Sequence, residues 1–523
     1  MGRKSWRGVT KWRTMAVCCL ALGMSMMDMF MVNVALPRIG QQLGAGFALV
    51  GWAVTGYMLM VGVLPVASGR LGDLFGRRRV FRIGMVIFLL SSLGSGLSWD
   101  IYSLIGFRVI QGVGNAMMTP LTLALIVAAF PAHQRGMALG IWGGVSGLGL
   151  ILGPVIGGVL IALGDWHWIF LFNLPIGLLA FLLTPLWVAE SRDESAPRQV
   201  DWWGLLVLTS ALLSIMLGLS LASRGGLSEP RVLMLLMAGL FLLVVFIKIE
   251  KLTPAPLVDL SLFTTRTFVV VCLAALAFFT AIFGSQPHIS MVVQQTWGYT
   301  ALEAGLVYLP GTVLVALITP FSGWLGGRLK ERLNLVIFAG AVVGGISVIP
   351  LMFLGDQNTF LNTMFPVSLL RGLGIGLFMS PSTLAAVSAL PPEKGGLASG
   401  IFTMSRQLGT ALGVAMLSAV YLGSVSGSLD EASAVYPVLG EERSRVEIGQ
   451  FRPVGEGEVL AASRKIVNSG YGVLNRVCLG LAILAALMAL MVRHRLKRED
   501  GEPTEKADGR ISGALHPLPE GGG

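Results

Sequence analysis

An aspartate and an arginine stand inside stretches of the chain that are otherwise apolar enough to cross a membrane. Asp28 lies within residues 15–36 and Arg108 within residues 102–125. A carboxylate at that depth is costly, so it must face the protein interior and pair, or take up a proton. A guanidinium keeps its proton and needs a carboxylate, carbonyl groups or water. We therefore expect Asp28 to pair with Arg108 and to couple protonation to shape, with a bound molecule and a proton competing for one site.

The plainer interpretation of both residues is structural. Asp28 would then be a buried acid satisfied by hydrogen bonds, and Arg108 an anchor near a helix end. Helical spacing places Met24, Met27 and Met31 on the same face as Asp28, and methionine suits a surface that repacks around varied apolar ligands. Ordinary core packing of these methionines is the alternative. We favour the functional interpretation, because an idle intramembrane acid is expensive.

A second acid meets a cluster of arginines in the stretch GRLGDLFGRRR, which begins at Gly69 and lies between two apolar stretches. Gly69 and Gly76 would let helix ends approach closely, since a Cβ would hold the backbones apart. Asp73 can cap a neighbouring helix by accepting hydrogen bonds from its first N–H groups. Arg77 and Arg78 would hold this corner against Asp73 and the anionic leaflet. Such a latch can form and break, so we expect a cytoplasmic gate here.

A third pattern is rich in glycine and spans residues 149–158. Its small or rigid positions are Gly149, Gly153, Pro154, Gly157 and Gly158. They predict a helix with a flat glycine face and a proline kink. Packing of this helix against the other half of the protein would seal the path and limit proton leak. Any tightly crossing helix pair would show a similar pattern.

Composition indicates that water is not the main solvent of this chain. Of its 523 residues, 54% are hydrophobic and only 13% are charged, and the mean hydropathy is +0.76; soluble domains average about 25% charged residues. The net charge is +10, but the basic residues alternate between loops, which indicates membrane orientation and argues against nucleic-acid binding. The four cysteines lie in apolar stretches and are interpreted as small hydrophobes. The chain shows no Gly-rich loop ending in Lys-Ser/Thr, so ATP is not the evident energy source.

About fourteen apolar stretches have spanning length. They are residues 15–36, 50–68, 80–97, 102–125, 136–162, 168–188, 202–222, 232–249, 267–291, 304–327, 334–354, 360–389, 397–423 and 471–492. We therefore predict an all-α polytopic membrane protein with two six-helix halves and two extra helices inserted between them. The predicted divisions are a cytoplasmic N-terminus (1–14), an N-terminal half (15–188), a linker with the inserted helices (189–266), a C-terminal half (267–492) with a long external loop (424–470), and a cytoplasmic, disordered tail (493–523).

A weak internal repeat supports the two halves. The sequence GWLGG from Gly323 can be laid over GRLGD from Gly69, and both copies follow the second helix of a six-helix set. Parallel repeats that meet at a midplane site are a common plan of transporters. The arginines and lysines cluster near the N-terminus, after residue 76, near residue 330 and after residue 492, so the positive-inside rule places both termini in the cytoplasm.

These stretches also carry a family resemblance. The sequence from Gly69 resembles the signature loop of the major facilitator superfamily. DMFMVNVALP from Asp28, DWHWIFLFNLP from Asp165 and RQLGTALG from Arg406 are similar to marks of its fourteen-helix drug:proton antiporter branch, of the EmrB and QacA type. The resemblance runs from about the first span to the last. It implies proton-driven export of amphipathic, often cationic compounds, with a midplane cavity between the six-helix halves.

The resemblance also implies roles for single residues. It assigns Asp28 to proton or substrate coupling, Arg108 to proton relay, and Asp73 and Arg77 to the cytoplasmic gate. Residues 397–423 carry Arg406 but no acid, whereas some members with a broad cation range hold acids there, so Asp28 remains the main intramembrane titrator. For the substrate cavity we expect Met24, Met27, Met31, Asn33, Phe279, Phe283, Met404 and Arg406, although aromatic residues at helical spacing more often serve packing.

The sequence thus predicts a proton-coupled exporter of hydrophobic or cationic small molecules in a bacterial cell membrane, driven by the proton gradient without a cofactor or metal. Its expected partners are the substrates, protons and the lipid bilayer, together with a periplasmic adaptor if the source has two membranes. A lipid, nutrient or metabolite carrier of the same fold stays open, because such cavities have similar linings. A polytopic membrane enzyme is disfavoured, since the five histidines are scattered and supply no acid–base cluster at one membrane face.

Overall fold

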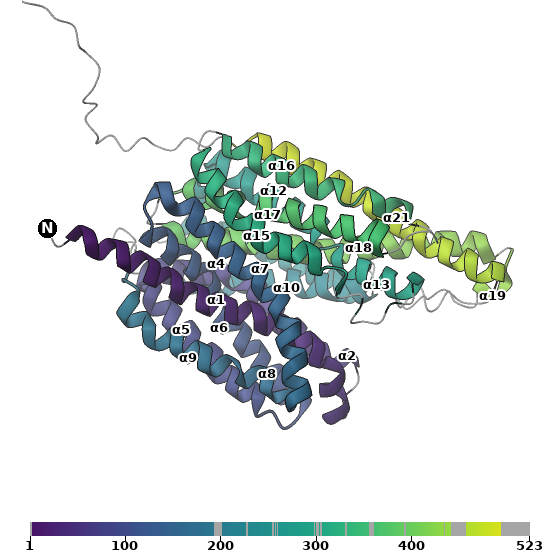
Figure 1. Cartoon of the computed structure of the whole chain (residues 1–523), viewed down its shortest axis with the longest axis horizontal. Coiled ribbons are helices and arrows are strands. Elements are labelled where there is room, and N and C mark those ends of the chain that lie inside the picture. The colour runs from purple at the N-terminus through teal and green to yellow at the C-terminus, as the bar shows by residue number, and fades with distance from the viewer. Residues whose placement is uncertain are drawn as a thin grey trace, which may run out of the picture.

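The structure is a computed structural model in which every regular element is a helix (Figure 1). It describes residues 3–492 apart from positions 46, 193–200, 226–228, 254–255, 257, 259, 298, 300–302, 304–305, 330–331, 355–359, 392–393, 434 and 441–456. The expected tail, residues 493–523, lies outside the described residues.

In the part of the N-terminal half that the structure describes there are nine helical segments. They are α1 (Arg3–Gln42), α2 (Phe47–Val50), α3 (Trp52–Val63), α4 (Pro65–Phe75), α5 (Arg77–Gly96), α6 (Ile101–Ala129), α7 (Ala132–Leu163), α8 (His167–Leu171) and α9 (Asn173–Trp187). The predicted second span is bent by 50° between α3 and α4, where Pro65 starts a new helix because its ring and missing N–H interrupt the old one. α6 begins at a capping box in which the Asp100 side chain accepts from the Ser103 N–H at 2.7 Å.

Two inserted helices and the C-terminal half follow. They are α10 (Trp202–Gly225), α11 (Pro230–Leu252), η1 (Leu260–Thr264), α12 (Arg266–Ile282), α13 (Gln286–Trp297), α15 (Leu309–Arg328), α16 (Leu333–Ile346), η3 (Pro350–Phe353), η4 (Phe360–Met364), α17 (Phe365–Ser388), α18 (Gly395–Ser433), α19 (Pro437–Gly440) and α21 (Gly457–Leu490). α10 packs against α11, against α3 of the first half and against α18 of the second. The inserted pair therefore bridges the halves.

The number of helices agrees with a polytopic membrane protein. In the described part of the chain, twelve helices are long and apolar enough to cross a membrane, or up to thirteen if the bent α3–α4 pair forms one span. α7, with 32 residues, lies outside that count and is also long enough for a span of about 20 residues.

Two segments predicted to lie outside the spans contain helix in the structure. The first helix begins at Arg3 and continues for 40 residues, roughly 60 Å, so most of the expected N-terminal extension is helical. Within the expected external loop, residues 424–470, the two described ends continue neighbouring spans, since α18 runs on to Ser433 and α21 starts at Gly457, while residues 441–456 lie outside the described part of the chain. Hydropathy marks where apolar residues end, but helix formation continues as long as the backbone pairs internally and neighbouring helices support it.

The two halves contact each other through equivalent helices. α4, from the second span of the first half, packs on α18, and α15, the second span of the other half, packs on α7. Both crossings use glycines: a Cβ on Gly69 would overlap the Gly396 carbonyl oxygen, and a Cβ on Gly136 would overlap that of Gly323. The repeated glycine sequences thus lie at corresponding interfaces, where only bare backbones fit.

Both crossings lie toward one end of the bundle, which we call the basic end. Lys11 and Arg328 line one pocket there, Arg13 lies over the Trp187 ring, and Arg78 donates to the Val188 carbonyl. The N-terminus marks this end at the left of Figure 1. The end is therefore closed between the halves and carries many of the loop arginines.

Candidate functional site

Asp28 and Arg108 form an ion pair in the interior of the N-terminal half. Arg108 Nη1 lies 2.7 Å from Asp28 Oδ2, and both side chains are 0% exposed. Asp28 lies in the middle of α1 and Arg108 near the start of α6, two helices that pack together. The pairing expected from the sequence is therefore present, since neither charge has water to stabilise it.

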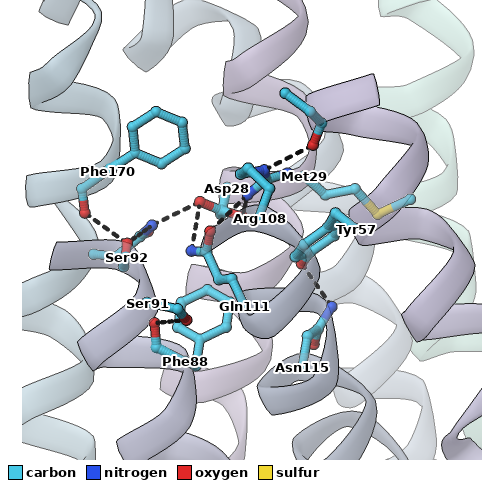
Figure 2. A network of polar contacts seen from close by, with 12 residues as sticks. Asp28, Met29, Tyr57, Phe88, Ser91, Ser92, Arg108, Gln111, Asn115 and Phe170 are labelled. Carbon is cyan, nitrogen blue, oxygen red and sulfur yellow. Dashed lines mark hydrogen bonds and ion pairs between the residues drawn. The ribbon is translucent and has the colours of Figure 1, made fainter. Parts of the chain in front are cut away.

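Two amides complete the surroundings of the carboxylate (Figure 2). Asp28 Oδ1 accepts from Gln111 Nε2 at 3.1 Å and from Asn173 Nδ2 at 2.7 Å. Gln111 lies one helical turn after Arg108 and also accepts from its Nη1 at 2.8 Å. Asn173, the first residue of α9, donates to Ser92 at 3.0 Å as well. Both oxygens of the Asp28 carboxylate thus accept hydrogen bonds, as a buried carboxylate requires.

Arg108 has further contacts that do not depend on Asp28. Its Nε donates to the Ala53 carbonyl at 3.1 Å, and its guanidinium lies 4.1 Å from the centre of the Tyr57 ring. Its Nη2 is buried without a hydrogen-bond partner. A neutral Asp28 would therefore leave a cation that α3 still holds through a carbonyl and an aromatic face.

A series of polar contacts, which begins with the Arg108 guanidinium over the Tyr57 ring, leads from this pair to a cavity. The Tyr57 hydroxyl, whose ring lies under Arg108, accepts from Asn115 Nδ2 at 2.7 Å (Figure 2). Asn115 Oδ1 accepts from Thr119 Oγ1 at 2.8 Å, and Thr119 lines the cavity. The ion pair is buried but connected to the cavity through polar side chains of α3 and α6.

The cavity has a volume of about 220 Å³ and lies between the halves. α1 contributes Met26, Met29 and Phe30, and the other half contributes Phe279, Phe283, Arg371 and Arg406 among others. Such an apolar space with a few polar groups is typical of a small-molecule site. Of the eight residues expected to line it, Phe279, Phe283 and Arg406 do so.

The other five expected residues lie elsewhere. Met24 and Met31 are buried in the packing of the N-terminal half, Asn33 is exposed, and neither Met27 nor Met404 lines the cavity. The reason is geometric, because residues on the face of Asp28 turn toward the half's own core. The neighbouring face of the same helix, with Met26, Met29 and Phe30, meets the cavity. Asp28 itself does not line it, so the expected single site for drug and proton is separated into two places.

Asp73 joins the halves at the basic end. Its Oδ1 accepts from the Gly396 N–H at 3.0 Å and its Oδ2 from the Leu397 N–H at 2.9 Å. Both N–H groups belong to the first turn of α18, whose positive dipole end the carboxylate complements. Arg77 Nε donates to Asp73 Oδ1 at 2.8 Å. Asp73 therefore caps a helix of the opposite half, as its sequence context indicates.

The neighbouring residues of this stretch act within the N-terminal half. Gly76 has a φ of 104°, a conformation that favours glycine, and it forms the turn between α4 and α5. The Arg78 backbone N–H donates to Glu190 Oε1 at 2.9 Å, and its side chain donates to the Val188 carbonyl at 3.1 Å. Arg78 thus fastens α5 to the end of α9 and does not cross to the other half.

The predicted glycine face of α7 packs differently from expectation. A Cβ on Gly149, Gly153 or Gly157 would meet α1 of the same half, and one on Gly158 would meet nothing within 4 Å. The side chain of Pro154 lies outside the described part of the chain. An earlier set of glycines, with Gly136 and Gly140, contacts α15 of the other half. The contact between the halves is therefore made by the part of α7 nearer the basic end, where the bundle is closed, and it extends as far as Gly147.

Sequence reasoning missed three polar residues of these sites. Gln111 and Asn173 hold Asp28, and Arg371 lines the cavity. Arg371 had a clear signal, since it is a lone arginine in the predicted span 360–389 and the cost argument used for Arg108 applies equally. The amide side chains of Gln111 and Asn173 carry no charge and no such cost, so the sequence gave no signal for them. Within the described residues, no group of three or more His, Cys, Asp or Glu side chains could hold a metal ion.

Comparison with known proteins gives consistent matches. The profile described as Major Facilitator Superfamily matches residues 18–414. The chain is 32% identical over 423 residues to the multidrug resistance protein Stp of Mycobacterium tuberculosis, covering 80% of this chain and 78% of that protein. It is 30% identical over 516 residues to the tetracenomycin C resistance and export protein of Streptomyces glaucescens. The match covers 95% of this chain and 93% of that protein. The solved structure of the proton:xylose symporter XylE superposes with a TM-score of 0.56 over 92% of this chain and 95% of that chain; at 16% identity this likeness shows the fold alone.

Proposed function

The chain belongs to the Major Facilitator Superfamily, and we propose that it exports drugs across a bacterial cell membrane in exchange for protons, with Asp28 as the proton-binding group. The names of its relatives, a multidrug resistance protein and a resistance and export protein, support drugs as the cargo. The observation that carries proton exchange is the buried Asp28–Arg108 pair. A carboxylate in such a place can change its charge, whereas a guanidinium cannot.

We assign the basic end to the cytoplasm. Arginine and lysine concentrate in cytoplasmic loops, and the closure of α4 on α18 and of α7 on α15 lies at this end. The structure then corresponds to the state in which the cytoplasmic side is shut. Opening requires that Asp73 release the N–H groups of Gly396 and Leu397, which water at the membrane surface can then solvate.

In the proposed cycle, a proton from outside neutralises Asp28 while the cytoplasmic side is shut. Arg108 then loses its counter-ion but keeps the Ala53 carbonyl and the Tyr57 ring, so the link between α1 and α6 weakens. The shifted α1 changes the cavity wall at Met26 and Met29. Cargo enters from the cytoplasm once that side opens, and loss of the proton inward restores the ion pair and the closed gate.

The test uses the purified full chain in proteoliposomes with an imposed pH gradient and a panel of fluorescent drugs and dyes. Asp28→Asn keeps the side-chain shape but cannot take up a proton, so we expect uphill transport to be lost while downhill exchange remains. Asp100→Asn is the matched control, because Asp100 is an acid of the same half that only caps α6.

Unfolding temperature and yield of each variant separate a transport defect from misfolding, which matters because breaking a buried pair costs about 3–5 kcal/mol. Asp28→Glu keeps the carboxyl group and should retain part of the coupling. Uphill transport by Asp28→Asn at the parent rate would remove Asp28 from the mechanism. Cargo movement that ignores the pH gradient in the parent protein would exclude proton exchange altogether.

A further inference from the structure

Two arginines of the C-terminal half line the cavity. Arg371 comes from α17 and Arg406 from α18. Each is the kind of residue that is rare in a spanning segment and that marks a substrate path when it faces a cavity. The proton-exchange proposal uses neither of them.

Arg371 is held in place but not fully satisfied. It is only 4% exposed, and its Nη2 donates to the Ile282 carbonyl and, at 2.7 Å, to the Ser285 hydroxyl. Its Nη1 is buried without a hydrogen-bond partner. The guanidinium is thus anchored on one edge by α12 and the residues that follow it, while another edge remains available for a ligand.

Arg406 is arranged in a similar way. Its guanidinium lies 4.6 Å from the centre of the Phe279 ring, and its Nε is buried without a hydrogen-bond partner. Phe279 is stacked on Phe283, with ring centres 4.6 Å apart and planes 6° apart. A cation therefore lies beside two parallel aromatic rings, and all three side chains line the cavity.

The cavity offers these two cations no acid. None of the described residues that line it is Asp or Glu, and the ion pairs found in the described part of the chain involve neither arginine. Asp28 is occupied with Arg108 on another face of α1. Uncompensated charge in an apolar space is unfavourable, so an anion that enters gains from both guanidiniums, whereas a cation is repelled.

We propose, as a refinement that rests on the proposed export function, that the cavity takes planar aromatic compounds carrying a carboxylate, sulfonate or phenolate group. The acidic group lies against the unpartnered edges of Arg371 and Arg406, and the ring system packs beside Phe279 and Phe283. Guanidinium groups suit planar anions because their N–H groups form a fixed fork. The preference is thus opposite to the cationic cargo that the family resemblance implies.

The experiment compares two dyes that share a xanthene ring system but carry opposite charge, fluorescein as the anion and rhodamine 123 as the cation. Binding to the purified full chain in nanodiscs is measured by fluorescence polarisation without any gradient. We expect the parent protein to bind fluorescein more tightly. Arg406→Gln and Arg371→Gln should each weaken fluorescein binding about 10- to 100-fold, the range for a lost hydrogen bond to a charged group, and should not weaken rhodamine 123 binding.

Arg406→Lys and Arg371→Lys keep the positive charge and should restore part of the fluorescein affinity, which a merely structural arginine would not explain. Arg38→Gln is the control, since Arg38 is an exposed arginine that does not line the cavity. Tighter binding of rhodamine 123, absent binding of fluorescein, or equal loss of both dyes in the glutamine variants would overturn the proposal. Because no gradient is applied, a protein that binds fluorescein but does not export it would refute the export function and leave the charge preference standing.

Discussion

Removal of the Asp73 carboxylate should shift most directly the equilibrium between the states that are closed and open at the basic end. Its carboxylate accepts two hydrogen bonds from the opposite half, from Gly396 at 3.0 Å and Leu397 at 2.9 Å. The third, from Arg77 at 2.8 Å, stays within the N-terminal half and does not join the halves. Asp73→Ala therefore removes two contacts that favour the closed state and should shift the protein toward the state open at the basic end.

The size of the shift follows from those two bonds. A hydrogen bond to a charged group is worth about 1.5–3 kcal/mol net, and the open state recovers part of this from water around the freed N–H groups. We therefore estimate a loss of about 2–3 kcal/mol, which is a change of about 30- to 150-fold in the equilibrium between the two states. Asp73→Asn keeps an acceptor oxygen and should show a smaller shift.

The assay measures access to the cavity from the basic end. The reporter is Thr403→Cys, since Thr403 lies in the cavity wall. The native cysteines are replaced in the same protein. Inverted vesicles that contain it are treated with a membrane-impermeant maleimide. Asp73→Ala should raise the labelling rate about 30- to 150-fold, until the open state dominates. Asp100→Ala removes an acid that caps α6 within the N-terminal half and does not contact the other half. It should leave the labelling rate unchanged. Equal labelling of Asp73→Ala and the parent, or an equal rise in Asp100→Ala, would refute the reasoning.

Three further changes test other parts of the structure. Gly69→Ala places a Cβ against the backbone of α18, which should cost the closed state about 1–3 kcal/mol and raise reporter labelling, whereas Gly158→Ala, with open space around the new Cβ, should change nothing. Arg78→Gln breaks a partly exposed contact between α5 and Glu190; it should lower unfolding stability by at most about 1 kcal/mol in thermal unfolding and leave labelling unaltered. Tyr57→Leu removes the ring beneath Arg108, a contact worth about 2 kcal/mol when desolvated. It should slow dye export far more than Tyr57→Phe, which keeps the ring. Equal export rates in the two variants would argue against a role for that contact.

The features that sequence could predict are those with a large local cost. Spans follow from the thickness of a bilayer, and the Asp28–Arg108 contact follows because two charges deep in apolar helices must find each other. Asp73 as a helix cap follows from an acid at the end of a span beside glycines. In each case the type of residue alone limits the surroundings in which the folded protein can place it.

The features that sequence could not predict depend on the relation between distant helices. The helix that Asp73 caps begins more than 300 residues later, and no local signal names it. Either set of glycines in α7 could have faced the other half, because both present bare backbone. Both faces of α1 carry methionines, so residue type could not decide whether Met24 or Met26 meets the cavity.

In the proposed export mechanism, that division of α1 into two faces determines how drug and proton can be coupled. Asp28 points into the N-terminal half and is bound to α6 and α9, while Met26, Met29 and Phe30 meet the cavity. A proton and a cargo molecule therefore do not need to displace each other from one place. α1 also packs closely on Gly149, Gly153 and Gly157 of α7, whose missing Cβ atoms leave room for Met26 and Phe30. In the proposed mechanism, α1 is fastened on one face by an ion pair that a proton can break, and its neighbouring face forms part of the cavity wall, so a change at Asp28 is carried to the cavity by the helix itself.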